Sequence, residues 1–290
     1  MAQAVADTLG GPRAALLHRA YMAVAILFLL APIVAVTIGS LTTTQYVVFP
    51  PKGLTLRWYG QMFDRPEMLS SFLLSLAIAA GSATIAVIIA VLAGLALVRH
   101  RSGLNVLLWM LVVSPMMLPA TVLGFAALQS YTGMGFGTSP LGLLAGHLVL
   151  VTPYTVVLVA TGLRSIDRTL EEAARSLGAS PRRTFTAVTF PLMAWSLAAG
   201  WVMAFLVSFG DAAVSIFLNT PGMVTLPVRI FDALRYSPLN PQLTALSSML
   251  VLVTALTLVA MAWLVRSERI LKQGTALAAP QPAQAMGVGS

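Results

Sequence analysis

Long apolar stretches, separated by shorter segments that hold most of the charged residues, dominate the pattern along this chain. Each stretch has about 20 or more residues, the length that an α-helix needs to cross a ~30 Å hydrocarbon core. Backbone groups inside lipid must form hydrogen bonds within their own segment, so a helix is the default conformation. The pattern therefore predicts an all-α membrane protein with six transmembrane helices, at residues 20–40, 72–98, 105–128, 141–163, 192–218 and 246–265.

Four prolines fall inside these predicted spans: Pro32, Pro115, Pro119 and Pro153. Proline lacks a backbone N–H and its ring clashes with the preceding turn, so each is expected to kink or locally open its helix. The alternative is that these helices tolerate their prolines, as membrane helices often do.

The composition agrees with a membrane protein. Hydrophobic residues make up 58% of the chain, charged residues 9%, and the mean hydropathy is +0.88, whereas a soluble domain has about 25% charged residues.

The pattern predicts a short segment at residues 1–19, one membrane domain over residues 20–273, and a disordered tail at residues 274–290. The first span is expected to be retained, because it is longer than a signal-peptide core. The chain has no cysteine, which excludes disulfides and thiolate chemistry.

The basic residues are distributed unevenly between the two sides of the membrane. With the amino terminus inside and six spans, twelve of the 17 Lys and Arg residues fall in inner segments and five in outer ones. This is the asymmetry of the positive-inside rule. It predicts that both termini are cytoplasmic, and it explains the net charge of +8 by topology, with no need for a nucleic-acid partner.

One inner segment, residues 164–191, is longer than the other inner links. Its residues predict two short helices. Asp167 is a suitable N-cap for the first, and Gly178 is a suitable left-handed stop. Ser180 can cap the second, with Pro181 at the first helical position, where its missing N–H is not needed. A helix–glycine–helix unit has the shape of a docking element, and an amphipathic helix resting on lipid headgroups is the alternative.

The spacing within this segment resembles a known motif. Glu172-Ala173-Ala174 is followed, after three intervening residues, by Gly178 and, after nine further intervening residues, by Val188-Thr189-Phe190-Pro191. This resembles the EAA loop of ABC-importer permeases, with Val188 and Phe190 as conservative replacements. The resemblance implies a type I ABC importer permease in which the loop docks on the ATPase, Glu172 and Gly178 shape that contact, and Pro191 leads into the fifth span.

Other stretches resemble the spermidine/putrescine type of these permeases, at residues 56–59, 146–154, 208–211 and 226–230, within a likeness that covers roughly residues 20–270. This implies import of polyamines or a related small amino compound in a bacterial inner membrane. The implied partners are two ATP-binding-cassette ATPase subunits, a second and different permease subunit, and an extracytoplasmic solute-binding protein. ATP is then bound by the partner ATPase, and this chain needs no cofactor.

Asp211 is the only carboxylate inside a predicted span. A charge at that depth costs roughly 2.5–3.5 kcal/mol on insertion scales and usually faces a cavity or a partner. Asp211 is therefore a candidate pathway residue for a cationic solute, with a helix contact or a hydrated position near the surface as alternatives. Tyr154 and Trp201 could offer aromatic faces to the cation, or they could pack in the core. His147 has no metal-binding companion nearby in the sequence and is expected to form a structural hydrogen bond.

Catalytic motifs are missing from the sequence. The Gly133–Gly137 stretch lacks the Gly-Lys-Ser/Thr ending of a phosphate-binding loop. An intramembrane enzyme would need a nucleophile with its base, a metal cluster or paired acids, and one Asp with one peripheral His does not supply them. The sequence thus predicts a transport subunit without enzymatic activity. A secondary transporter driven by an ion gradient stays as the alternative, although such proteins usually have more intramembrane polar groups or internal repeats.

Overall fold

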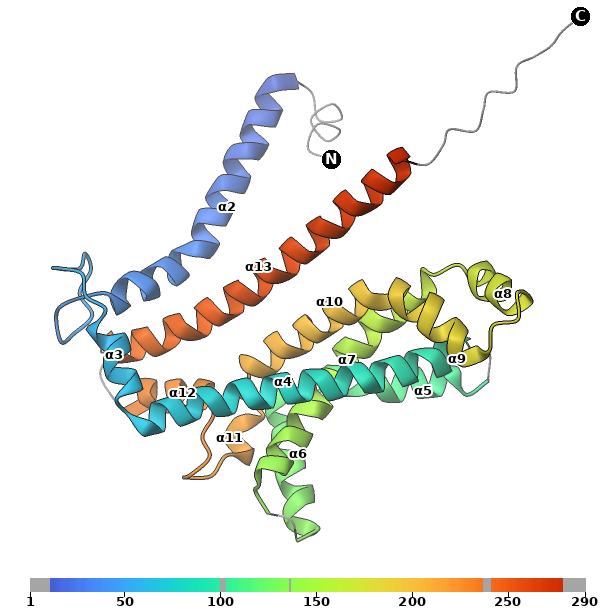
Figure 1. The fold of residues 1–290 in the computed structure, drawn as a ribbon. Helices are drawn as coiled ribbons and strands as arrows, with labels where there is room; N and C mark the ends of the chain where they lie inside the picture. The colour runs from blue at the N-terminus through green and yellow to red at the C-terminus, as the bar shows by residue number, and fades with distance from the viewer. Residues whose placement is uncertain (1–10, 100–102, 136, 237–240, 279–290) are drawn as a thin grey trace, which may run out of the picture. The chain divides into compact units, whose positions relative to one another are not determined.

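The computed structural model describes residues 11–99, 103–135, 137–236 and 241–278, and helices make up nearly all of the regular structure in them (Figure 1). The backbone divides into two units. The first contains the chain up to Ser70 together with Arg229–Leu252, and the second contains Ser71–Val228 together with the chain from Val253 onward.

The first unit contains α2 (Gly11–Ser40), α3 (Arg57–Phe63), most of α12 (Leu226–Tyr236) and the start of α13 (Pro241–Ala278). Tyr59 on α3 joins two of these helices, because its hydroxyl lies 2.6 Å from the Ser40 hydroxyl and 2.6 Å from the Ser248 hydroxyl. The neighbouring Trp58 is buried and its Nε1 donates to the Thr42 carbonyl oxygen at 2.7 Å. The aromatic residues of α3 therefore connect elements of this unit.

The second unit holds the remaining spans and the long inner segment. In chain order its elements are α4 (Pro66–Gly94), the π-helical turn η1 (Leu95–Arg99), α5 (Asn105–Val113), the 3₁₀ turn η2 (Ser114–Met117), α6 (Ala120–Gly133), α7 (Pro140–Arg164), α8 (Arg168–Ser176), α9 (Pro181–Thr184), the π-helical turn η3 (Phe185–Thr189), α10 (Phe190–Phe209) and α11 (Ser215–Leu218).

The centre of this unit is the pair α7 and α10, whose contact is the most extensive between any two elements. Small residues allow the approach: a Cβ added at Gly162 on α7 would collide with the side chain of Ser196 on α10. Small side chains also line the buried face of α4, including Ser75, Ala79 and Ser82. Close packing of this kind is how helices associate in a bilayer, where lipid is as apolar as the helix surface.

Five described helices are long and apolar enough to cross a membrane, and there are six candidate spans if one bent pair counts as a span. That pair covers 105–117 and 120–133 and is bent by 105°. The span predicted at 105–128 is therefore broken into two helices, and the local opening predicted at Pro115 and Pro119 is confirmed. Leu118 is extended (ψ 140°) because it precedes Pro119. By contrast, Pro32 and Pro153 lie inside continuous helices.

The fifth span differs from the prediction at both ends. Helix runs without interruption from Pro181 to Phe209, in place of the predicted 192–218. Pro191 does not break the helix, because the turn η3 precedes it with a hydrogen bond from the Phe190 N–H to the Phe185 carbonyl oxygen. In this π-helical register the helix continues through Pro191, although Pro191 has no N–H to donate. At the other end Gly210 terminates α10, since glycine is a poor helix former.

The termini also extend beyond the predicted spans. α2 begins at Gly11, within the predicted segment 1–19, and α13 continues to Ala278, into the predicted tail 274–290. Residues 1–10 and 279–290 lie outside the described part, so the disorder of the tail stays a prediction there.

Candidate functional site

The long inner segment forms the helix–glycine–helix unit that its sequence predicts. The Asp167 carboxylate accepts a hydrogen bond from the Thr169 N–H at 2.9 Å, which lowers the pKa of Asp167. This cap is therefore present above the ordinary carboxyl pKa and is lost as the pH falls through the lowered value. Ser180 caps α9 by accepting from the Arg183 N–H, with Pro181 in the first turn.

Gly178 ends α8 in the left-handed conformation, with φ of +88°. The Gly178 N–H donates to the Arg175 carbonyl oxygen, and the Ala179 N–H donates to the Ala174 carbonyl oxygen. These two bonds form a Schellman motif, which satisfies carbonyl groups at the end of the helix. The predicted left-handed stop is confirmed, and it fixes the angle at which the chain turns from α8 into α9.

The residues of the EAA-like motif lie mainly on the surface of this unit. Glu172, Ala173 and Gly178 are exposed, Ala174 is half-buried, and Pro191 is exposed in the first turn of α10. Beside them, α8 presents an apolar stripe at helical spacing formed by Leu170, Ala173, Ala174 and Leu177. Leu170 is 48% exposed and Leu177 is 89% exposed. A surface of this kind is typical of a protein contact.

A pocket of about 360 Å³ continues this surface along the second helix. Leu177, Gly178 and Ala179 line one part of it, and Ala187 and Val188 line another. The motif positions were predicted from the sequence, whereas Leu170 was not. Its position four residues before Ala174 is the signal in the sequence that completes the stripe.

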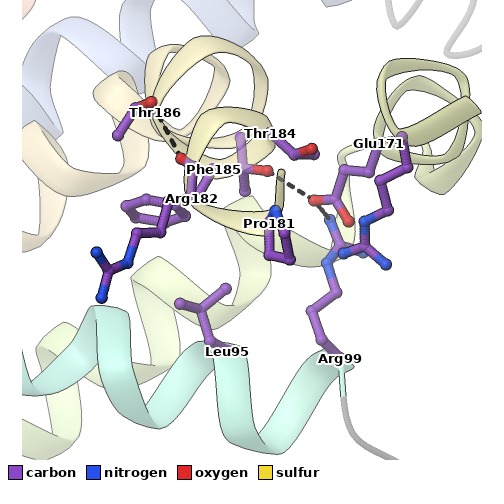
Figure 2. A pocket seen from close by; sticks show the side chains of 10 residues that line it. Leu95, Arg99, Glu171, Pro181, Arg182, Thr184, Phe185 and Thr186 are labelled. Carbon is purple, nitrogen blue, oxygen red and sulfur yellow. Dashed lines mark hydrogen bonds and ion pairs between the residues drawn. The ribbon is translucent and has the colours of Figure 1, made fainter. Parts of the chain in front are cut away.

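Glu171, the neighbour of the motif glutamate, is buried where Glu172 is exposed. Its Oε1 lies 2.8 Å from Arg99 Nη2 and accepts a hydrogen bond of 2.8 Å from the Thr189 hydroxyl. Arg99 belongs to η1 at the end of α4, and Thr189 belongs to η3 at the start of α10. One carboxylate therefore links α8 to the ends of two spans (Figure 2).

Two further contacts hold the end of α4. Arg168 Nη2 on α8 donates to the Val98 carbonyl oxygen at 2.7 Å, and Asn105 Nδ2 on α5 donates to the Leu97 carbonyl oxygen at 3.2 Å. The last carbonyls of a helix lack partners within it, so these side chains satisfy them. The positive charge of Arg168 also suits the negative end of the helix dipole. These contacts at the end of α4 were not predicted, because in the sequence Arg99 and Arg168 contribute only to the count of basic residues on the inner side.

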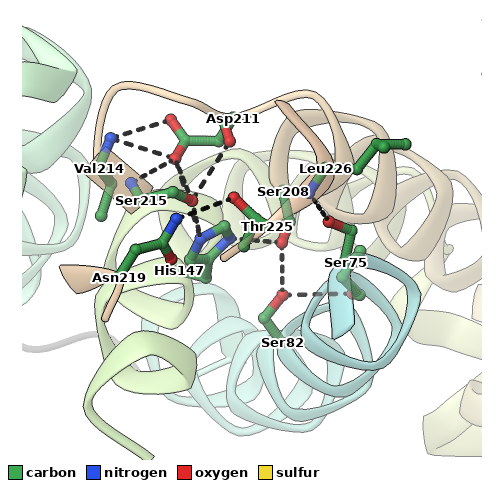
Figure 3. Close-up of polar contacts among 11 residues, drawn as sticks. Ser75, Ser82, His147, Ser208, Asp211, Val214, Ser215, Asn219, Thr225 and Leu226 are labelled. Atoms are coloured by element: carbon green, nitrogen blue, oxygen red, sulfur yellow. Dashed lines mark hydrogen bonds and ion pairs between the residues drawn. The ribbon is translucent and has the colours of Figure 1, made fainter. Parts of the chain in front are cut away.

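A buried polar network lies at the opposite end of α7 and α10 (Figure 3). His147 Nδ1 is 2.7 Å from the Ser208 hydroxyl, and His147 Nε2 is 2.9 Å from the Ser215 hydroxyl. Ser208 accepts from the Ser82 hydroxyl at 3.1 Å, and Ser215 donates to the Asp211 carboxylate at 3.1 Å. The tautomer that carries its proton on Nε2 satisfies this chain of donors. The structural hydrogen bond predicted for His147 is confirmed.

Asp211 is buried, but it does not lie inside a helix as predicted. It follows the end of α10, and its carboxylate accepts from the Val214 N–H at 3.1 Å and from the Ser215 N–H at 3.0 Å. This is the geometry of a side chain that caps a helical turn, here α11. The carboxylate is thus stabilised by local donors. His147 Nε2 lies 3.9 Å from Asp211 Oδ2.

Among the described residues, neither aromatic candidate forms a hydrogen bond with this network. Trp201 stacks on Phe205, with ring centroids 5.3 Å apart, and its Nε1 donates to the Thr84 hydroxyl on α4 at 3.1 Å. Tyr154 is half-buried on α7. The structure therefore places Trp201 in a helix-packing contact and does not bring it into the polar contacts of Asp211.

The comparisons with known proteins agree with this arrangement of spans and inner loop. The family model described as "Binding-protein-dependent transport system inner membrane component" matches residues 86–270. The chain belongs to this family. It is a multi-pass inner membrane subunit of an ABC importer, a transport permease and not an enzyme, and ATP is handled by a partner ATPase. Membership in this family replaces the alternative of an ion-gradient-driven transporter.

Individual relatives and solved structures support the same family and fold. The chain is 33% identical over 231 residues to the putrescine transport system permease protein PotI of Escherichia coli (strain K12), covering 77% of this chain and 81% of PotI. It is 30% identical over 246 residues to the spermidine/putrescine transport system permease protein PotC of the same strain, covering 84% of this chain and 92% of PotC. A crystal structure of a bacterial ABC transporter that imports alginate shares the fold, with a TM-score of 0.64, 16% identity, and coverage of 87% of this chain and 95% of that one. The fold is that of a type I ABC importer permease.

Proposed function

We propose that this permease subunit imports a polyamine or a related small amino compound. Support for this substrate class comes from the relatives named above, which are permeases for putrescine and for spermidine and putrescine. The solute would move by alternating access, in which ATP-driven closure of the partner favours one of two membrane conformations.

The proposed coupling element is α8 with the turn at Gly178. Its exposed apolar stripe is the single observation that carries this proposal, because two exposed leucines on a helix whose residues outside the stripe are charged or polar would be covered by a partner. Glu172 is exposed beside this stripe and would contact polar groups at the rim of the ATPase cleft. Movement of α8 would then reach the spans through Glu171.

The proposed assembly has two ATP-binding-cassette ATPase subunits, a second and different permease subunit, and an extracytoplasmic solute-binding protein. Both termini of this chain are proposed to be cytoplasmic, on the evidence of twelve basic residues in inner segments and five in outer ones. This orientation places α8 on the side where ATP is available.

The proposed solute pathway includes Asp211, with Tyr154 and Trp201 as aromatic contributors. Because Asp211 already caps α11, pairing with a cation would require that its contacts with Val214 and Ser215 rearrange. An aspartate that exchanges between a cap and a cation would bind solute in one conformation of the transport cycle and release it in the other.

The coupling proposal is tested by crosslinking from a cysteine introduced at Ala179. The chain contains no native cysteine, so the introduced thiol reports on a single position. We expect a crosslink to the ATPase subunit that changes with ATP. A cysteine at Gly222, where an added Cβ meets open space, is the matched control. A crosslink of equal yield from both positions, or none from either in inserted protein, would reject α8 as the docking element.

The substrate class is tested separately by uptake of radiolabelled putrescine into vesicles that contain the complete transporter. We expect ATP-dependent uptake that unlabelled spermidine reduces by competition. Uptake of neither polyamine, in a preparation whose Ala179→Cys variant crosslinks normally, would exclude polyamines and leave the coupling proposal intact.

A further inference from the structure

A second pocket, of about 530 Å³, lies between α8, the end of α4 and the start of the fifth span. Three arginines line it: Arg99, Arg175 and Arg182. The charge of Arg99 is balanced by Glu171, whereas neither Arg175 nor Arg182 forms an ion pair with a residue that the structure describes. The pocket therefore carries an excess of about two positive charges.

Buried donors without a partner point to this same pocket. In the described part of the chain, three buried side-chain nitrogen or oxygen atoms form no hydrogen bond: Arg99 Nε, Thr184 Oγ1 and Asn219 Oδ1. The first two belong to residues that line this pocket. A buried polar atom that stays unpaired costs about 1–3 kcal/mol, so a small shift that lets Arg99 and Thr184 meet the acceptor oxygens of a ligand would be favourable; Thr184 also lines the 360 Å³ pocket.

The lining also contains apolar residues that belong to the ends of spans, beside the polar Thr186 and Thr189. Leu95 lies on η1, which continues α4, and Phe185 lies on η3, which continues into α10. Figure 2 shows Leu95 and Pro181 between the Arg182 side chain and the Arg99–Glu171 pair. A ligand that fits must therefore combine an anionic group with an apolar part, and it must be available at the boundary of the hydrocarbon core.

We propose that this pocket binds the phosphate group of an anionic phospholipid from the inner leaflet. Arginine guanidinium groups form strong, charge-assisted hydrogen bonds with phosphate oxygens, and the leaflet at the cytoplasmic face supplies anionic headgroups. The inner-leaflet assignment rests on the proposed orientation of the chain. A lipid held here touches α8, η1 and η3 together, so its presence would stiffen the link through which α8 moves the spans.

The experiment uses the complete transporter, with its partner permease, ATPase and binding protein, in nanodiscs of phosphatidylcholine with or without phosphatidylglycerol. Native mass spectrometry counts the phosphatidylglycerol that stays bound after release from the nanodisc. We expect the Arg175→Gln, Arg182→Gln double variant to bind this lipid about tenfold more weakly. Thr184→Val, which removes the unpaired hydroxyl without changing the charge, should also weaken retention.

Arg183→Gln is the matched control, because Arg183 is adjacent to Arg182 on α9 but lines the other pocket. Equal loss of lipid in this variant would show attraction to the surface in general and would overturn the site. Inorganic phosphate is added in a further arm: displacement of the lipid by millimolar phosphate supports the anion site and identifies free phosphate as a competing ligand.

Copurification of the ATPase from the same samples separates this proposal from the coupling proposal. Loss of ATPase with unchanged lipid in the Arg175 and Arg182 variant would show that an acidic segment of the ATPase fills the pocket, and it would overturn the lipid assignment. Normal lipid retention and normal ATPase binding in all variants would overturn it as well. Failure of the wild-type complex to copurify with ATPase would count against the coupling proposal alone.

Discussion

Gly178 has a backbone conformation that disfavours a side chain, since its φ of +88° lies where an L-residue is strained by about 1–2 kcal/mol. An added Cβ would meet open space there, so the penalty comes from the backbone alone. We expect Gly178→Val to shift the turn after α8 and to uncouple ATP hydrolysis from uptake while membrane levels stay normal.

Two variants make this prediction specific. Gly178→Asn should retain most of the coupling, because asparagine tolerates the left-handed region. Gly135→Val places the same strain at another glycine with positive φ, +79°, outside the α8–α9 segment. Uptake in the Gly178→Val variant that equals that of Gly135→Val would contradict the role of this turn.

Asp211 offers a second test at this scale, because its capping role and its proposed role in the pathway predict different results. Asp211→Asn removes the charge and one acceptor oxygen, but asparagine caps a helical turn about as well as aspartate, so we expect a loss of stability below about 1 kcal/mol. Ser215→Ala also disturbs the cap and the contact with His147, but it keeps the carboxylate. We expect uptake of a cationic solute to fall further in Asp211→Asn, measured as the initial rate per assembled complex. Equal rates in the two variants would limit Asp211 to a structural role.

At the scale of elements, adjacent glutamates on α8 are expected to have separate functions. Glu171 is buried between η1 and η3, and Glu172 is exposed. Glu171→Gln leaves Arg99 without its counter-charge, and loss of one partner of a buried pair costs about 3–5 kcal/mol; the amide of Gln reduces this by retaining an acceptor. We expect this variant to bind ATPase normally and to transport poorly.

Glu172→Gln should show the opposite pattern, with weaker ATPase binding and proportionate loss of transport. The two variants are compared by copurification of ATPase and by solute moved per ATP hydrolysed. A double variant of Arg99→Gln with Glu171→Gln should lose less than the sum of the single losses, because the pair acts as a unit. Additive losses would show that the ion pair does not transmit the movement of α8.

For the whole molecule, the number of crossings depends on the bent pair α5 and α6. If these helices together cross the membrane, there are six spans, and Met134 after α6 lies on the outer side. If they re-enter, the chain crosses five times and Met134 lies inside. We expect six crossings, because only an even number of crossings places the basic residues near the two termini on the same side of the membrane.

The measurement is labelling of a Met134→Cys variant in intact cells with a thiol reagent that does not cross membranes. Met134 is 67% exposed, so the position is accessible to the reagent. Labelling in intact cells supports six crossings, and Ala179→Cys should be labelled only after the cells are opened. Labelling of Met134→Cys only in opened cells would establish the re-entrant arrangement and would place the termini on opposite sides.

Features that depend on local chemistry are predictable from the sequence. Apolar length predicts the approximate places of the long helices, and the capping residues Asp167 and Ser180, with the glycine at position 178, predict the unit of two short helices, because each interaction lies within a few residues of the chain. The spacing of the EAA-like motif led to the family, which the comparisons then showed.

Which side chains meet depends on the packing of distant segments, as two neighbouring residues show. Glu171 and Glu172 have the same chemistry and adjacent positions, yet the contacts with Arg99 and Thr189 come from residues 72 and 18 positions away and bury only the first. The same holds for Asp211, whose apparent depth in a span became a capping position once Gly210 ended α10. Burial and pairing depend on packing between distant segments, and hydrophobic periodicity along one segment contains no information about that packing.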